Sequence, residues 1–311
     1  MFPARRGMPR VTTEREPRAA RIDAPAALAL VCCCALWGLN QVAIKAALPE
    51  VGSLIQLSVR SVVALVLVLA WMRWRRIPWH WRDGTLWPGL LAGLLFAIEF
   101  GCIFVGLQYT TAARSVVFIN TSPFVVALVL AWLVPAERLR PLQALGLAVA
   151  FGGVAFAFAE PAPRTDGWPW LGDALILVAA ALWGLTTVII RFSSLRHAAP
   201  EKTLAYQLLV SALLSPAAAW VSGAPWPAAW SALAIGSLFY QAVIVTFASY
   251  LLWFGLLTRY PATKVQAFVF LTPVFGAAFA AGLLEEPLGV ELLVALVAVA
   301  VGLSLLNRRH R

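Results

Sequence analysis

The chain has 311 residues, of which 61% are hydrophobic and only 12% are charged, and its net charge is +10. A soluble domain has about 25% charged residues, so this chain cannot cover its surface with polar side chains, and lipid must solvate much of it. The composition therefore excludes a soluble globular protein. The basic residues cluster at the ends of apolar runs, which is typical of residues that face a cytoplasmic membrane surface, so no nucleic-acid partner is expected.

In chain order, residues 1–25 mix arginine, proline and acidic residues without apolar periodicity, which predicts a disordered basic cytosolic tail. Apolar segments follow, most of them about 20 residues long, the length that crosses a bilayer. The ten predicted transmembrane helices are Ala26–Leu48, Leu54–Met72, Leu86–Gln108, Ala112–Val134, Pro141–Ala159, Leu171–Phe192, Thr203–Val221, Trp230–Leu257, Ala262–Leu284 and Leu288–Asn307. Residues 160–170 are a predicted linker, and residues 308–311 form a second basic cytosolic tail.

The distribution of lysine and arginine predicts the orientation of these helices. If the N-terminus is cytoplasmic, 20 of the 24 basic residues fall in segments on the cytoplasmic side and three fall in segments on the other side. Lysine and arginine are retained on the cytoplasmic side, so both termini are expected there.

Two halves of the chain repeat one another. The sequence Ala-Leu-Trp-Gly-Leu begins at Ala35 and again at Ala181, and "NTSP" before Phe124 parallels "FLTP" before Val274. Each half contains five helices, an odd number, so the second half enters the membrane from the opposite face. The sequence therefore predicts an all-α protein of two inverted five-helix repeats, residues 26–159 and 171–307, around a central cavity. Such a pair has two nearly equivalent packings, one open to each side.

These paired motifs, their order and the number of helices resemble the EamA-type permeases of the drug/metabolite transporter superfamily. The resemblance covers residues 26–307 and implies a multi-pass protein of the bacterial inner (plasma) membrane. It also implies transport of small metabolites, such as amino acids or related compounds, often by export. It implies no cofactor and no metal, and the expected partners are a small-molecule substrate and the lipid bilayer. We expect a monomer or homodimer.

Polar residues in the repeated Ala-Leu-Trp-Gly-Leu helices share one helical face. Trp37, Asn40 and Gln41 have the spacing i, i+3 and i+4, and their repeat partners are Trp183, Thr186 and Thr187. Amides are costly in lipid, so this face is expected to point inward, where it either binds a ligand or holds helices together. Gly38 and Gly184 favour close helix packing.

Arg60 and Glu99 are the two ionisable residues deep inside predicted helices, where a charge costs about 2.5–3.5 kcal/mol. One interpretation is a buried ion pair that locks the second and third helices. The other makes Glu99 a proton acceptor or a partner for a substrate ammonium, and Arg60 a partner for a carboxylate. The repeat places Gln207 opposite Arg60, so the predicted site is asymmetric.

Arg114 and Lys264 lie at the start of the fourth and ninth predicted helices, where their side chains either extend to the membrane interface or act as gates. Pro123 and Pro273 are expected to kink the same two helices from within. The remaining predicted cavity-lining residues are Asn120, Tyr250 and Gln266.

Together these features predict a secondary transporter that works by alternating access and is driven either by an ion gradient, with Glu99 as the candidate proton carrier, or by the gradient of the substrate. A channel-like facilitator is the alternative. The sequence has no HExxH pair, Gly-x-Ser-x-Gly elbow or phosphate-binding glycine loop, so no catalytic residues and no enzyme activity are expected.

Overall fold

The computed structural model describes residues 22–80, 83–133, 139–159, 168, 170–260, 265 and 267–307. Over this part of the chain every regular element is helical, as the composition predicted. Residues 1–21 and 308–311, most of the predicted linker, Lys264 and Gln266 lie outside the described residues.

Eight described helices are long and apolar enough to span a membrane, and two shorter apolar helices cover Phe268–Leu284 and Val290–Leu306. The ten transmembrane helices expected from the sequence thus have eight clear counterparts. The elements are α1 (Ala24–Ala47), α2 (Ser53–Trp74), α3 (Leu86–Tyr109), α4 (Ala112–Ile119), α5 (Ser122–Leu133), α6 (Pro141–Ala159), α7 (Leu171–Phe192), η2 (Ser194–His197), α8 (Pro200–Val221), α9 (Ala232–Phe239), η3 (Tyr240–Ser249), α10 (Tyr250–Arg259), η4 (Ala267–Phe270), α12 (Leu271–Leu284) and α13 (Val290–Asn307).

The fourth predicted helix is divided into α4 and α5 at Asn120 and Thr121. The end of α4 is satisfied by side chains, because Asn120 Nδ2 donates to Val116 O at 2.7 Å and Thr121 Oγ1 donates to Phe118 O at 2.7 Å. Pro123 lies in the first turn of α5, where a missing N–H breaks no helical hydrogen bond. Pro273 likewise lies in the first turn of α12, directly after η4, so at both prolines the regular helix changes just before the proline, and the kinks expected from the sequence stay a prediction.

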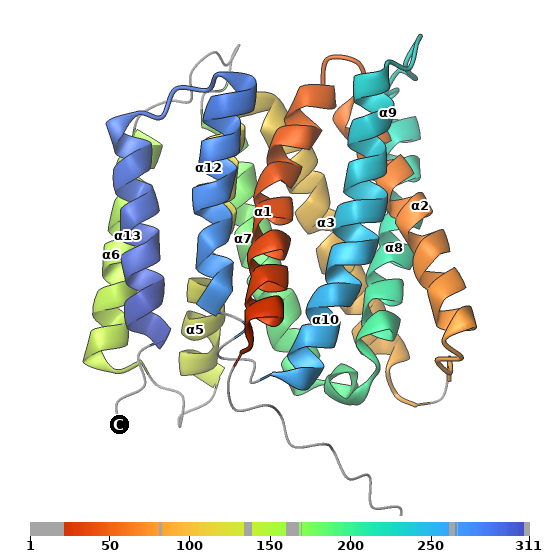
Figure 1. Cartoon of the computed structure of the whole chain (residues 1–311), viewed down its shortest axis with the longest axis horizontal. Helices are drawn as coiled ribbons and strands as arrows, with labels where there is room; N and C mark the ends of the chain where they lie inside the picture. The colour runs from red at the N-terminus through yellow and green to blue at the C-terminus, as the bar shows by residue number, and fades with distance from the viewer. Residues whose placement is uncertain are drawn as a thin grey trace, which may run out of the picture.

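The helices pack side by side in one bundle (Figure 1). The pair α6 and α13 forms one end of the bundle in this view, α2 packs against α8 towards the other end, and α1 packs against α12 between them. A Cβ atom on Gly38 would lie 2.6 Å from the backbone nitrogen of Gly276, and one on Gly184 would lie 2.9 Å from Val125 Cβ. The close helix packing predicted at both glycines is confirmed.

One face of the bundle contains the connection between α3 and α4, which we call the junction and define as Leu107–Arg114. Lys45, near the end of α1, and Asp173, in the first turn of α7, both bind Thr110 of the junction. The end of α1 and the start of α7 therefore lie on this junction face. The start of α1 and the end of α13 lie on the opposite face (Figure 1).

Candidate functional site

Arg60 of α2 lies inside the bundle with 1% of its surface exposed. Its Nε donates to Thr246 Oγ1 at 2.8 Å, and its Cζ lies 3.9 Å from the centre of the Phe100 ring. Among the described residues, neither Nη group has a hydrogen-bond partner. A guanidinium fork in this state is suited to a planar anion such as a carboxylate.

Glu99 of α3 is 5% exposed and is the carboxylate that interacts electrostatically with Arg60. The two residues form no ion pair within 4.0 Å in the described structure. The hydroxyl of Tyr250 interacts electrostatically with both. Arg60 and Glu99 thus share one interior region without a direct bond, and the ion pair between α2 and α3, which was one of the two interpretations of the sequence, is not formed in the described structure.

The interior region around Arg60 is bounded by α2 and by a π-helix, η3, which packs against α2. Thr246 Oγ1 accepts from Arg60 and donates to Gln241 O at 2.8 Å, five residues earlier in the same element. Gln241 Nε2 in turn donates to Gln56 Oε1 of α2 at 3.0 Å. π-Helices are rare and are frequently found at functional sites, so this element is a second sign of function next to Arg60.

The indole ring and the side-chain amides of α1 lie next to the same interior region as Arg60 and Tyr250. Trp37 Nε1 donates to Ser249 Oγ at 2.8 Å, and the ring lies 5.9 Å from that of Tyr250. Asn40 and Gln41 are each 7% exposed, and their side-chain oxygens have no partner among the described residues. We call Trp37, Asn40, Arg60, Glu99 and Tyr250 the central site.

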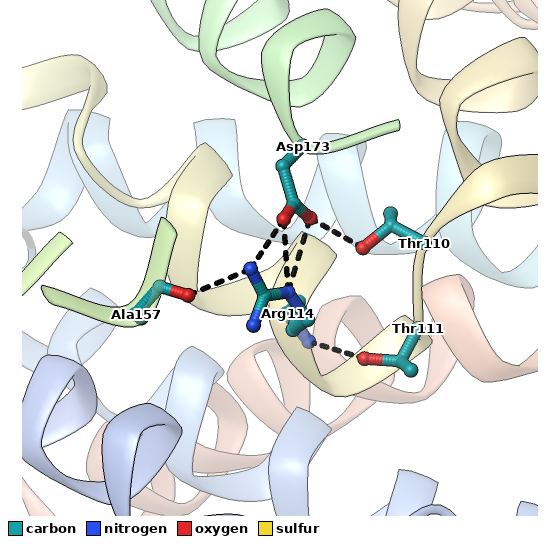
Figure 2. Close-up of polar contacts among 5 residues, drawn as sticks. All are labelled: Thr110, Thr111, Arg114, Ala157 and Asp173. Carbon is teal, nitrogen blue, oxygen red and sulfur yellow. Dashed lines mark hydrogen bonds and ion pairs between the residues drawn. The ribbon is translucent and has the colours of Figure 1, made fainter. Parts of the chain in front are cut away.

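A second polar cluster lies at the junction (Figure 2). Arg114 is 5% exposed and Asp173 is fully buried, and Arg114 Nε lies 3.0 Å from Asp173 Oδ2. The guanidinium also donates to Ala157 O at 2.8 Å, and Thr110 Oγ1 donates to the Asp173 carboxylate. Arg114 therefore does not extend to the interface, because Asp173 supplies a buried partner for its charge.

The opposite face has its own charged contact, between Asp83 of the α2–α3 connection and Lys202 in the first turn of α8. Lys202 Nζ donates to Asp83 Oδ2 at 2.6 Å and to His80 O at 2.7 Å. The hydrogen bond from Lys202 holds the pKa of the Asp83 carboxyl well below its usual range, with a further contribution from Thr85. Asp83 therefore stays ionised at neutral pH.

Comparison with known proteins decides the family. The model of the EamA-like transporter family matches the chain twice, over residues 24–159 and 170–308. The chain belongs to the EamA-like transporter family. It is a membrane transporter and not an enzyme, and the resemblance recognised in the sequence is confirmed.

Relatives and solved structures agree with this membership. An "Uncharacterized transporter" of Archaeoglobus fulgidus is 28% identical over 81% of this chain and 86% of the relative. A "Probable amino-acid metabolite efflux pump" of Escherichia coli is 27% identical over 86% of this chain and 90% of the relative. A crystal structure with 18% sequence identity covers 91% of this chain and 97% of its own chain with a TM-score of 0.61, so the two share a fold.

Several residues predicted to line the cavity of this EamA transporter lie apart from the central site. Thr187 is exposed, and its hydroxyl donates back to Trp183 O at 3.1 Å within α7. Gln207 is half-buried on α8, and no described hydrogen bond ties it to Arg60 or Glu99. Asn120 is buried but caps its own helix.

Two cavities stand out in the described structure of the EamA transporter, and neither contains Arg60 or Glu99. A groove of about 430 Å³ lies between α6 and α13 and is lined by valine, leucine and alanine. A second, of about 670 Å³, lies between the segments 48–52 and 225–231. The central cavity expected from the sequence stays a prediction.

Sequence reasoning missed three residues that the fold brings to these clusters: Asp173, Thr246 and Ser249. Asp173 had a usable signal, because it is an acidic residue in the first turn of an apolar helix. Thr246 and Ser249 had a weaker one, since hydroxyl side chains inside membrane helices are commonly satisfied by their own backbone.

Proposed function

We propose that this EamA transporter is a secondary transporter that moves a small metabolite, an amino acid or a derivative, across the bacterial inner membrane by alternating access. The observation that carries the proposal is the central site: Arg60 and Glu99 are both buried, Arg60 Cζ lies 3.9 Å from the ring of Phe100, which follows Glu99, and the two charged residues form no ion pair in the described structure. Arg60 offers its Nη groups to a carboxylate, and Glu99 offers a carboxylate to an ammonium. A molecule with both groups would satisfy both residues. The name of the Escherichia coli relative supports the same substrate class.

Two inverted units are one architecture that supports alternating access, and the placement of the helices supports such a pair here. The end of α1 and the start of α7 lie on the same face, so these two repeat-related helices run in opposite directions. The family model matches once in each half. The pairs α2–α8 and α6–α13 join equivalent helices of the two halves, as a two-fold axis in the membrane plane would require.

The proposed orientation places the junction face outside and both termini in the cytoplasm. It is supported by the positive-inside pattern and by the start of α1 and the end of α13, which share the opposite face (Figure 1). Export or import would be driven by a proton gradient acting through Glu99 or by the gradient of the substrate.

The test is uptake of radiolabelled amino acids by the purified protein in liposomes. Transport should saturate, be stimulated by substrate inside the vesicles and depend on pH. Glu99→Gln should lower the rate at least about tenfold, the effect of losing one charge-assisted hydrogen bond, and should remove the pH dependence.

Glu50→Gln is the matched control, because Glu50 is an exposed glutamate on the α1–α2 connection, and this variant should transport like the unmodified protein. A Glu99→Gln variant with unchanged rate and pH profile would remove Glu99 from the mechanism. Unsaturable flux near diffusion rates would instead indicate the channel-like facilitator.

A further inference from the structure

Charged side chains from distant parts of the chain converge on the junction between α3 and α4. Lys45 Nζ of α1 donates to Leu107 O at 2.9 Å and to Thr110 O. Asp173 of α7 binds Arg114 and Thr110 (Figure 2). The junction is therefore bound by a cationic side chain of its own half, Lys45, and by an anionic side chain of the other half, Asp173.

A second anion from the other half binds the start of α4. Glu286 follows the end of α12, and its two carboxylate oxygens each accept a backbone N–H, from Ala112 at 2.9 Å and from Ala113 at 2.9 Å. These are unpaired donors of the first helical turn, which carries the positive end of the helix dipole. Glu286 also interacts electrostatically with Lys45.

The side-chain hydrogen bonds and the ion pair from the second half to this segment, in the described structure, are therefore charge-assisted, and they stand beside close backbone packing of Gly172 against Tyr109 and Thr110. A permanent seam between halves is better served by apolar packing, because replacing a buried ion pair by apolar residues is often neutral or stabilising. Charged contacts have a different property: water can solvate both partners once they separate. Contacts of this kind suit a surface that must open and close repeatedly.

We propose that the junction is the gate that closes the face opposite the cytoplasmic tails, with Asp173 and Glu286 as the positioning residues that hold it shut. This inference rests on the proposed alternating access. Opening requires α7 and α12 to withdraw together, so that Asp173 leaves Arg114 and Glu286 leaves the amides of α4. The structure has both contacts formed, which is the arrangement that the proposal assigns to the closed gate.

The reporter for gate opening is Ser115→Cys in the full-length chain with its four native cysteines replaced by alanine. Ser115 follows Arg114, is fully buried and has a hydroxyl without a hydrogen-bond partner in the described residues, so the nearly isosteric cysteine breaks no contact. The measurement is the rate at which a membrane-impermeant methanethiosulfonate labels this cysteine in right-side-out and inside-out vesicles.

With the gate intact, labelling from outside should be slow. Asp173→Asn and Glu286→Gln should each accelerate it about tenfold in right-side-out vesicles, since each removes a charge-assisted contact from the closed state only. Glu50→Gln should leave the rate unchanged, because Glu50 is exposed on the α1–α2 connection of the same face and glutamine keeps a side-chain oxygen that can accept from Ser231 N, as the Glu50 carboxylate does at 3.3 Å. Chromatographic homogeneity of each variant shows that it is folded.

Unchanged labelling in both folded variants would overturn the gate and leave the proposed transport function intact. Acceleration confined to inside-out vesicles would overturn the assignment of this gate to the outer face. If Asp173→Asn does not fold, Glu286→Gln decides the question, because it retains the Arg114–Asp173 pair. A wild-type protein that transports nothing would count against the proposed function, whatever the labelling shows.

Discussion

At the scale of single residues, Thr246 is the group that fixes Arg60 in the central site, because its hydroxyl accepts from Arg60 Nε and donates to Gln241 O. Thr246→Val has nearly the same shape but leaves the buried Nε without a partner, which costs about 1–3 kcal/mol. We expect a lower melting temperature in detergent and a raised KM for transport. Thr246→Ser keeps the hydroxyl and should restore both values. Equal KM values for the valine variant and the wild type would contradict a role for Thr246 in positioning Arg60.

At the scale of helices, the crossing of α1 and α12 depends on Gly38, where a Cβ would lie 2.6 Å from Gly276 N and 2.9 Å from Thr272 O. Backbone atoms cannot give way as a flexible side chain can, so Gly38→Ala should destabilise the protein by about 1–3 kcal/mol, the range for overpacking. Gly101→Ala on α3 is the matched control, since its Cβ would meet nothing within 4 Å, and alanine favours the helix by about 1 kcal/mol. Thermal unfolding of both variants should therefore shift in opposite directions. A Gly38→Ala variant as stable as the Gly101→Ala control would show that α1 and α12 can move apart at Gly38 without a loss of stability.

At the scale of the whole molecule, the proposed orientation places the junction face and the opposite face, which carries Arg73, Arg75 and Arg76 at the end of α2, on opposite sides of the membrane. Glu50 and His80 are exposed residues on the α1–α2 and α2–α3 connections. In the cysteine-free chain, Glu50→Cys should react with an impermeant thiol reagent in intact cells, and His80→Cys should react only after the membrane is permeabilised, because basic connections are retained in the cytoplasm. The reverse pattern of labelling would invert the topology and place the proposed gate inside.

Composition and local pattern determined much of this fold. Runs of about 20 apolar residues must be helical in lipid, where each backbone polar group needs a partner within its own segment, and eight of them have counterparts of spanning length. The paired motifs, their order and the number of apolar runs together gave the resemblance to the family, and the glycines of the Ala-Leu-Trp-Gly-Leu motif predicted close helix contacts. Arg60 and Glu99 stood out because ionisable residues are costly at membrane depth.

The tertiary structure alone decided which side chains meet. Arg60 is bound to Thr246, which lies 186 residues away in the chain, and Arg114 to Asp173, because partners are set by how helices pack and not by their spacing along the sequence. The π-helix also had no signal in the sequence, since the apolar pattern of a membrane helix is the same on either side of it. Sequence alone thus determined that the chain crosses the membrane and where charge is buried. The three-dimensional contacts decided how each buried charge is satisfied, because that energy depends on distances of a few ångströms between helices.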